Sequence, residues 1–157
     1  MLPDDATSPE LAASYAAARK REGKVMAILR AMGPRAEVVD AFVALADAVL
    51  YRPAALSRRE RELLAVATSQ ANRASYSETV HAQLLEELGG SDGSVRDQAL
   101  IEFARRLTLT PDRDAVTELQ EHLSDAEIHD AIAVVALLNL ANRAAIATGI
   151  CPADDLF

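Results

Sequence analysis

Residues 56–81 read LSRRERELLAVATSQANRASYSETVH, and this stretch holds two signals for the start of a helix. Ser57 and Ser75 are each followed three residues later by a glutamate. This is the spacing of a capping box, in which the serine and glutamate side chains bind backbone N–H groups that the first turn leaves unpaired. We therefore expect two consecutive helices, the first capped by Ser57 and the second capped by Ser75 and running to Leu88, where Gly89-Gly90 ends it.

Helix signals of the same kind recur along the chain, and no run alternates apolar and polar residues as a half-buried strand would. The pattern predicts an all-α fold in a single domain of residues 1–157. The other expected elements are a helical stretch from Ser8-Pro9-Glu10 to Gly33-Pro34 with Gly23 as a possible break, a helix from Arg35 to Leu50, one from about Ser94 to Leu107, a short acidic helix opened by Thr110-Pro111, and a last helix from the capping box Ser124–Glu127 to Gly149.

Two of these helices carry apolar residues at three- and four-residue steps, which predicts a stripe that faces the core. The predicted core positions are Val38, Val39, Phe42, Leu45, Ala46 and Val49 in the first, and Val95, Leu100, Ile101, Phe103 and Leu107 in the second.

Charge and composition exclude several partners. The net charge is −8, so the field of the protein repels phosphate backbones and anionic lipid, and we expect no binding to nucleic acid or to membrane surfaces. The N-terminus MLPDDATSPE is acidic where a secretory signal is basic and then apolar, which favours a cytoplasmic location. The apolar run from Ala131 is interrupted by Asn139, Asn142 and Arg143, which argues against a membrane span and for a helix buried in protein.

Cysteine and histidine usage limits the chemistry further. Cys151 is the only cysteine, so no internal disulfide, CxxC pair or thiolate metal site can form. It follows the C-terminal glycine of the last helix, where the helix dipole disfavours a thiolate, and we expect an inert thiol. His122 and His129 fall in separate predicted helices without a second close pair of ligands, so we expect no metal and no cofactor.

Ser77 and His81 are four residues apart and share one face of their predicted helix. With Glu62 they could form a nucleophile, a base and an orienting acid, because such triads are recognised by geometry and not by chain order. A local hydrogen-bonding role for Ser77 in the first helical turn is the alternative. The spacing alone does not bring Glu62 to Ser77, since one precedes and the other follows the turn between the helices.

The same stretch resembles the core motif of the AhpD-like and carboxymuconolactone decarboxylase superfamily, a glutamate on one helix followed by Asn-x-Cys-x-Tyr/His-Cys-x-x-x-His. Glu62, Asn72, Tyr76 and His81 match that motif, whereas Ala74 and Ser77 stand at the two cysteine positions. Residues 100–149 are similar to the C-terminal half of the peroxidase-related branch, including Asn142-Arg143 and the following glycine.

The resemblance implies an AhpD-like helical fold, a homo-oligomer, and a site of Glu62, Tyr76, Ser77 and His81, with Ala74 at the lost first-cysteine position. The apolar last helix also favours an oligomer, because one small domain cannot easily cover it. The antioxidant alkylhydroperoxidase activity implied by the family needs a thiolate and a resolving thiol. Neither Ala74 nor Ser77 supplies one, so we expect no dithiol peroxidase cycle.

Three functions remain open at this point. The favoured one is a non-redox enzyme that uses Glu62 and His81 for acid–base chemistry on a small molecule, as the decarboxylases of the superfamily do, with Arg73 as a candidate cation for a substrate carboxylate. The second is a non-catalytic relative that keeps the fold for binding or assembly. The third is a residual peroxidase activity through Cys151.

Overall fold

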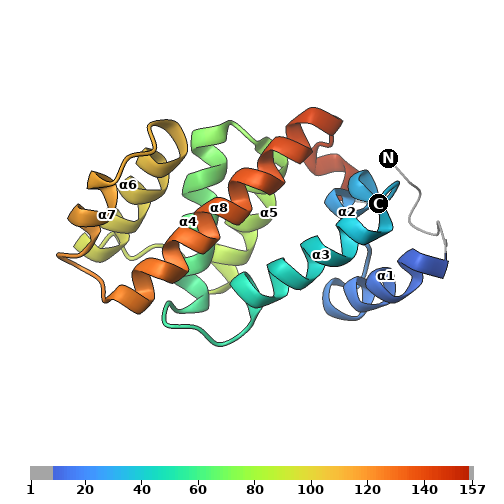
Figure 1. Cartoon of the computed structure of the whole chain (residues 1–157), viewed down its shortest axis with the longest axis horizontal. Coiled ribbons are helices and arrows are strands. Elements are labelled where there is room, and N and C mark those ends of the chain that lie inside the picture. Colours follow the sequence, from blue (N-terminus) through green and yellow to red (C-terminus); the bar gives the residue numbers. More distant parts are fainter. Residues whose placement is uncertain (1–8, 156–157) are drawn as a thin grey trace.

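The computed structural model describes residues 9–155, and this part of the chain is all-α, which confirms the predicted fold class (Figure 1). The π-helix η1 spans Asp47–Tyr51, and the 3₁₀-helix η2 spans Pro152–Asp155. The α-helices are α1 Pro9–Glu22, α2 Ala27–Met32, α3 Ala36–Ala46, α4 Arg58–Asn72, α5 Ser75–Glu87, α6 Val95–Leu109, α7 Asp114–Leu119 and α8 Asp125–Thr148.

Helix α4 is the central element, since α5, α6 and α8 all pack against it. Figure 1 shows α8 running diagonally across α4 and α5, with α6 and α7 at one end and α1 to α3 at the other. The side chains that fill the space around α4 are apolar and almost completely buried, among them Leu64, Leu100, Phe103, Val134, Val135 and Leu138. A second cluster, formed by Leu11, Tyr15, Ala18, Val25, Leu29 and Val39, joins α1, α2 and α3.

Helix starts predicted from local sequence are mostly correct. Ser57 and Ser124 form complete capping boxes, and the Ser94 side chain accepts a hydrogen bond from the Asp97 N–H. Gly23 breaks the first helical stretch with φ +75°, and Gly149 ends α8 with φ +71°, a conformation that glycine adopts without strain. The Ser8 cap lies outside the described residues.

The capping box predicted at Ser75 is wrong. Helix α4 ends at Asn72, Arg73 is left-handed with φ 57°, and the Ala74 N–H donates back to the Ser69 carbonyl. This tight turn puts Ala74 at the cap position and Ser75 already inside α5, so no side chain caps this helix. The Glu78 side chain instead accepts a hydrogen bond from Gln70 of α4.

Both apolar stripes are narrower than predicted. In the first, Val39 and Ala46 are buried, but Val38 and Leu45 are 41% and 44% exposed. In α6, Val95 is 67% exposed, and Ile101 also faces outward. A helix of about 3.6 residues per turn can bury only the side chains that point at neighbouring helices. The side chains of the four exposed residues lie outside that face.

Two element boundaries also differ from the prediction. The helix expected to run to Leu50 changes to π geometry at Asp47, and the short acidic helix begins at Asp114 rather than after Pro111. The turn to π geometry involves tertiary contacts: Arg61 of α4 donates hydrogen bonds to the carbonyls of Val49 and Arg52 at the end of η1.

Within the described part of the chain, α8 is the one helix long and apolar enough to cross a membrane by length and composition. Its middle residues Val134, Val135 and Leu138 are buried against the other helices, which accounts for its apolar character. Leu140 and Ile146 are the exceptions, at 50% and 54% exposed.

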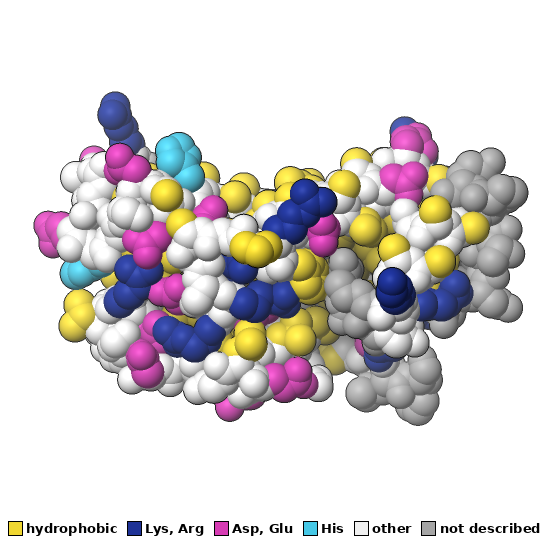
Figure 2. Space-filling view, turned by 90° about the horizontal axis from the view of Figure 1, so that it is seen from below, with side chains coloured by type: hydrophobic (Ala, Val, Ile, Leu, Met, Phe, Trp, Pro, Cys, Tyr) yellow, Lys and Arg dark blue, Asp and Glu magenta, His cyan; other side chains and the backbone are white. Residues whose placement is uncertain are grey.

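On the face drawn in Figure 2, acidic and basic side chains are interspersed, and hydrophobic side chains gather toward the middle.

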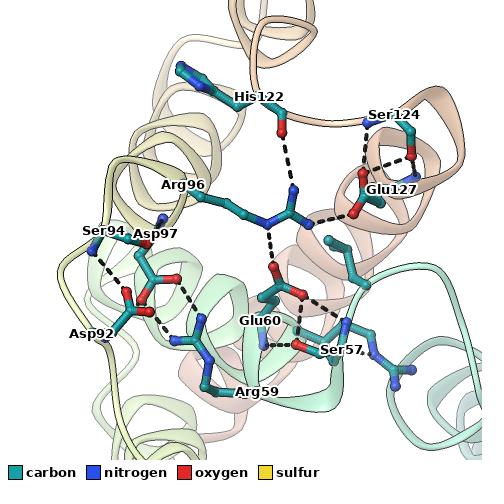
Figure 3. Close-up of polar contacts among 12 residues, drawn as sticks. Ser57, Arg59, Glu60, Asp92, Ser94, Arg96, Asp97, His122, Ser124 and Glu127 are labelled. Atoms are coloured by element: carbon teal, nitrogen blue, oxygen red, sulfur yellow. Dashed lines mark hydrogen bonds and ion pairs between the residues drawn. The ribbon is translucent and has the colours of Figure 1, made fainter.

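A polar cluster joins the starts of α4, α6 and α8 (Figure 3). Arg96 of α6 donates to Glu60 and to Glu127, the two glutamates of the capping boxes, at 2.6 and 2.5 Å. Arg59 binds the fully buried Asp97 with two hydrogen bonds of 2.8 Å each. The guanidinium of Arg59 lowers the pKa of the Asp97 carboxyl well below its usual range, against the opposing effect of burial. This cluster ties helix ends together and needs no further role.

The different positions of Val135 and Leu140 on α8 predict different effects of the same substitution. Val135→Asp should destabilise the fold by about 3–5 kcal/mol, because an unpaired carboxylate would lie in the core. Leu140→Asp places the charge on a half-exposed site and should leave the fold intact. Thermal and urea unfolding followed by circular dichroism would measure both, and equal losses would contradict the packing of α8 described above.

The homo-oligomer remains a prediction, now restricted to the exposed apolar side chains of α8. Size-exclusion chromatography with light scattering should give a multiple of the 16.8 kDa chain, and Leu140→Asp should lower it. A wild-type protein that is monomeric at micromolar concentration would refute the prediction.

Candidate active site

Glu62 and His81 form a buried pair between α4 and α5. The Glu62 side chain is fully buried, and its Oε2 lies 2.6 Å from Nδ1 of His81. Since a two-residue connection turns α5 back along α4, a residue near the start of α4 lies opposite the middle of α5. The pairing of Glu62 with His81 implied by the family resemblance is therefore present, and Ser77 is not bonded to Glu62.

Arg58 is the second partner of the Glu62 carboxylate. Its Nε donates to Glu62 Oε1 at 2.7 Å, and its Nη2 contacts the same oxygen. The guanidinium also lies over the Tyr51 ring, 4.3 Å from the ring centre. Sequence reasoning missed Arg58, although its spacing of four residues from Glu62 on one helix was the available signal.

The partners of Glu62 decide its ionisation. Burial by itself raises the pKa of the Glu62 carboxyl, but the hydrogen bond and charge of His81 and the charge of Arg58 outweigh burial, so the pKa lies below its ordinary value of 4.5. An ionised carboxylate only accepts hydrogen bonds, so His81 donates from Nδ1. A neutral His81 then keeps its lone pair on Nε2, where it can accept a proton.

His81 lines a small cavity of about 90 Å³ enclosed by α2, α3, η1, α5 and α8. Apart from His81, Ser77 and two tyrosines, the lining is apolar, and it contains no lysine or arginine. The remaining lining residues are Met26, Ile28, Leu29, Phe42, Ala46, Leu50, Tyr51, Tyr76, Val80, Leu84 and Ala141. A small neutral molecule fits such a site better than an anion does, because nothing in the lining would compensate a buried negative charge.

Tyr76 contributes its ring to the cavity wall, while its hydroxyl points elsewhere. The hydroxyl donates to Asp155 Oδ2 at 2.5 Å and accepts from the Ile28 N–H at 3.4 Å. Burial and the Asp155 carboxylate raise the pKa of the Tyr76 hydroxyl above its ordinary value of 10.0. Tyr76 is therefore held on Asp155 rather than on the Glu62–His81 pair.

Ser77 lines the same cavity and is 4% exposed, and among the described contacts no hydrogen bond joins it to His81. Ala74 is buried at the cap of α5 and lines a different hollow. Arg73 lines that hollow too, so the expectation that Arg73 holds a substrate carboxylate beside His81 is wrong. Arg73 ends α4 in a left-handed backbone conformation and does not line the cavity beside His81.

Four further candidate residues lie apart from this cavity. Asn72 donates to the Thr68 carbonyl and to Asn139 Oδ1, so it links α4 with α8. Cys151 is exposed beyond the end of α8. His122 and His129 are also exposed, and the described residues contain no group of three or more His, Cys, Asp or Glu side chains that could hold a metal ion.

The fold and the site together define a helical-bundle protein with a buried glutamate–histidine pair beside a small apolar cavity. The sequence model of the Carboxymuconolactone decarboxylase family matches residues 36–104, which include α3, α4, α5 and the first part of α6. This match and the solved structures below support the AhpD-like and carboxymuconolactone decarboxylase superfamily for this chain. A search of curated protein sequences gave no significant match.

Solved structures share this fold over nearly the whole chain. An uncharacterized peroxidase-related protein from Silicibacter sp. TM1040 is 25% identical with a TM-score of 0.84, over 96% of this chain and 89% of its own. A second peroxidase-related protein with an alkylhydroperoxidase AhpD core, from Ralstonia eutropha JMP134, is 26% identical with a TM-score of 0.79, over 96% and 86%. The debrominase Bmp8 bound to 2,3,4-tribromopyrrole has a TM-score of 0.75 over 90% and 84%, and at 17% identity this likeness shows the fold alone.

The buried pair predicts a pH-dependent contribution to stability. Because the pKa of Glu62 is lowered in the folded state, its contribution is present above pH 4.5 and is lost as the pH falls through the folded-state pKa. At pH 7, Glu62→Gln should cost about 3–5 kcal/mol, since Arg58 and His81 lose their anion. Urea unfolding of both proteins from pH 7 down to pH 3 should show the difference narrowing in acid.

Glu87→Gln is the matched control, because Glu87 is an exposed glutamate on α5. It should leave stability nearly unchanged at every pH. A Glu62→Gln difference that stays constant down to pH 3 would show that the carboxylate is not ionised in the fold.

Proposed function

We propose that this protein is a non-redox enzyme that transfers a proton to or from a small, neutral, largely apolar molecule, with His81 as the acid–base group and Glu62 as its orienting carboxylate. The observation that carries the proposal is the fully buried Glu62 bonded to a histidine that lines an apolar cavity. A buried ion pair adds little to stability compared with apolar packing, so its position at a cavity favours a chemical role.

The proposed reaction follows from the hydrogen-bond pattern of the pair. Nε2 of neutral His81 accepts a proton from the bound molecule, and the Glu62 carboxylate stabilises the imidazolium that forms. The same imidazolium then returns the proton to another atom of the substrate or to water. The apolar walls support this step, because charge–charge attraction between Glu62 and the imidazolium is stronger when water is excluded.

The cavity lining also favours a neutral substrate over a carboxylated one. Arg73 lies at a different hollow, and Arg58 already donates to Glu62 Oε1. A substrate carboxylate in the cavity would therefore lose its hydration without gaining a cation from the lining. This argues for a reaction at a weakly acidic C–H or O–H group rather than a decarboxylation that needs a bound carboxylate.

A model substrate tests the base directly. In 5-nitrobenzisoxazole, a base removes the ring C–H proton while the N–O bond breaks, and the product is a coloured cyanophenolate. We expect wild type to accelerate this elimination by a factor of at least about 10², the low end of general-base catalysis. His81→Gln should abolish the acceleration, and Glu62→Gln should reduce it.

Two controls separate this proposal from its alternatives. His122→Gln and Cys151→Ser should leave the elimination rate unchanged, because both residues are exposed and do not line the cavity. An acceleration that survives His81→Gln, or none in wild type, would contradict the proposed base and favour a relative that keeps the fold for binding or assembly.

We also propose that dithiol peroxidase activity is absent, although two structural neighbours are described as peroxidase-related. The chain has one thiol, Cys151, and it does not line the cavity. Consumption of an organic hydroperoxide with a dithiol reductant should be no faster for wild type than for Cys151→Ser. Turnover that disappears in the variant would show that Cys151 reacts with peroxide after all.

A further inference from the structure

We infer that Arg58 is a positioning residue for His81: it holds one oxygen of Glu62 so that the other oxygen fixes the His81 ring with Nε2 available to the cavity. This inference rests on the proposed function and extends it to a residue that does not touch the substrate. Arg58 also links the Glu62–His81 pair to the cavity wall, because it packs on Tyr51, a lining residue of η1.

The two oxygens of the Glu62 carboxylate bind different partners. Oε1 of Glu62 takes Nε of Arg58 at 2.7 Å, and Oε2 takes Nδ1 of His81 at 2.6 Å. The carboxylate is fully buried, whereas the Arg58 side chain is 26% exposed and its charge is partly hydrated. Arg58 thus compensates the buried anion at one oxygen at moderate desolvation cost, while His81 binds the other oxygen.

A second contact, with the Tyr51 ring, fixes the orientation of the Arg58 guanidinium. Its guanidinium plane has the Tyr51 ring beneath it, and Tyr51 ends the π-helix η1. Arg61, one turn further along α4, donates to the carbonyls of Val49 and Arg52 and so anchors the same segment. Arg58 and Arg61 of α4 therefore both hold η1, and Arg58 also holds Glu62.

Removing Arg58 leads the Glu62–His81 pair to take up one proton from solvent and moves the ring proton of His81 to its other nitrogen. Without a cation at Oε1, the buried Glu62 is driven toward its neutral form, because burial disfavours an unpaired charge. A protonated carboxyl donates to Nδ1 of His81 instead of accepting from it. The neutral imidazole then carries its own proton on Nε2, the ring nitrogen that Glu62 does not bind, and can no longer act there as a base.

The test reads the His81 tautomer and its reactivity in the ligand-free protein. ¹⁵N–¹H correlation spectra of the imidazole should show the Nδ1–H form in wild type and a shift toward the Nε2–H form in Arg58→Gln. Diethylpyrocarbonate provides a second readout: Nε2 attacks a carbonyl carbon and takes the ethoxycarbonyl group, the C–O bond to the ethyl carbonate leaving group breaks, and the ring proton passes to that leaving group, which decomposes to ethanol and carbon dioxide. Modification of His81 should slow by about tenfold in the variant, the scale on which outer partners of functional histidines matter.

The chain offers a matched control and an internal standard. Arg59→Gln removes an arginine from the same helix that also pairs with a buried carboxylate, that of Asp97, and neither residue lines the cavity. It should lower stability without changing the His81 tautomer or its modification rate. His122 and His129 are exposed and should react equally in all variants.

Arg58→Lys covers the case in which Arg58→Gln does not fold. Lysine keeps the charge but not the forked, ring-stacked geometry, so the modification rate of His81 should fall between those of wild type and the glutamine variant. A tautomer and rate equal to wild type in the variants of Arg58 that fold would overturn the inference. Since neither readout needs turnover, a failed elimination assay with a shifted tautomer would refute the proposed reaction and leave the positioning role of Arg58 standing.

Discussion

A single negative charge buried in the centre of the bundle constrains much of this structure. Glu62 lies on α4, the helix against which three others pack, and its carboxylate has no exposed surface. Such a charge is tolerated only when its oxygens are paired, because the free energy of dehydration is otherwise uncompensated. The pairing to Arg58 fixes the start of α4, and the pairing to His81 fixes α5 against α4.

Two other buried acids, Glu60 and Asp97, differ from Glu62 in what surrounds them. Glu60 completes a capping box and Asp97 closes the loop before α6, and each is bound to an arginine of a neighbouring helix (Figure 3). Helix ends account for both residues. Glu62 caps nothing, and its histidine partner lines a cavity. Glu60 and Asp97 therefore have a structural explanation at helix ends, and Glu62 has none of that kind.

The cavity combines walls from distant parts of the chain with one polar end. Helix α2 contributes Ile28 and Leu29, η1 contributes Leu50 and Tyr51, and α5 contributes the polar side chains. The Tyr76 ring is fixed in this wall because Asp155, near the end of the described chain, accepts from its hydroxyl and from the Ala27 N–H. Membership of the superfamily thus supplies the frame of the site, whereas the side chains within that frame set its chemistry. Ala74 and Ser77 lie in the turn and the first part of α5 and bring no thiol to it, and proton transfer is the chemistry that we propose there.

Local sequence determined most of the helices of this protein, and tertiary packing decided the site. The caps at Ser57, Ser94 and Ser124 and the ends at Gly23 and Gly149 were predictable, because each depends on contacts within about four residues. The family resemblance pointed to Glu62 and His81, which the spacing alone did not join. Only the folded chain showed that α5 starts without a side-chain cap, that Arg73 lies away from the cavity, and that Tyr76 is bonded to Asp155, 79 residues away. Burial, cavity walls and long-range hydrogen bonds depend on how helices pack, and that information is spread over the whole chain rather than contained in any one turn.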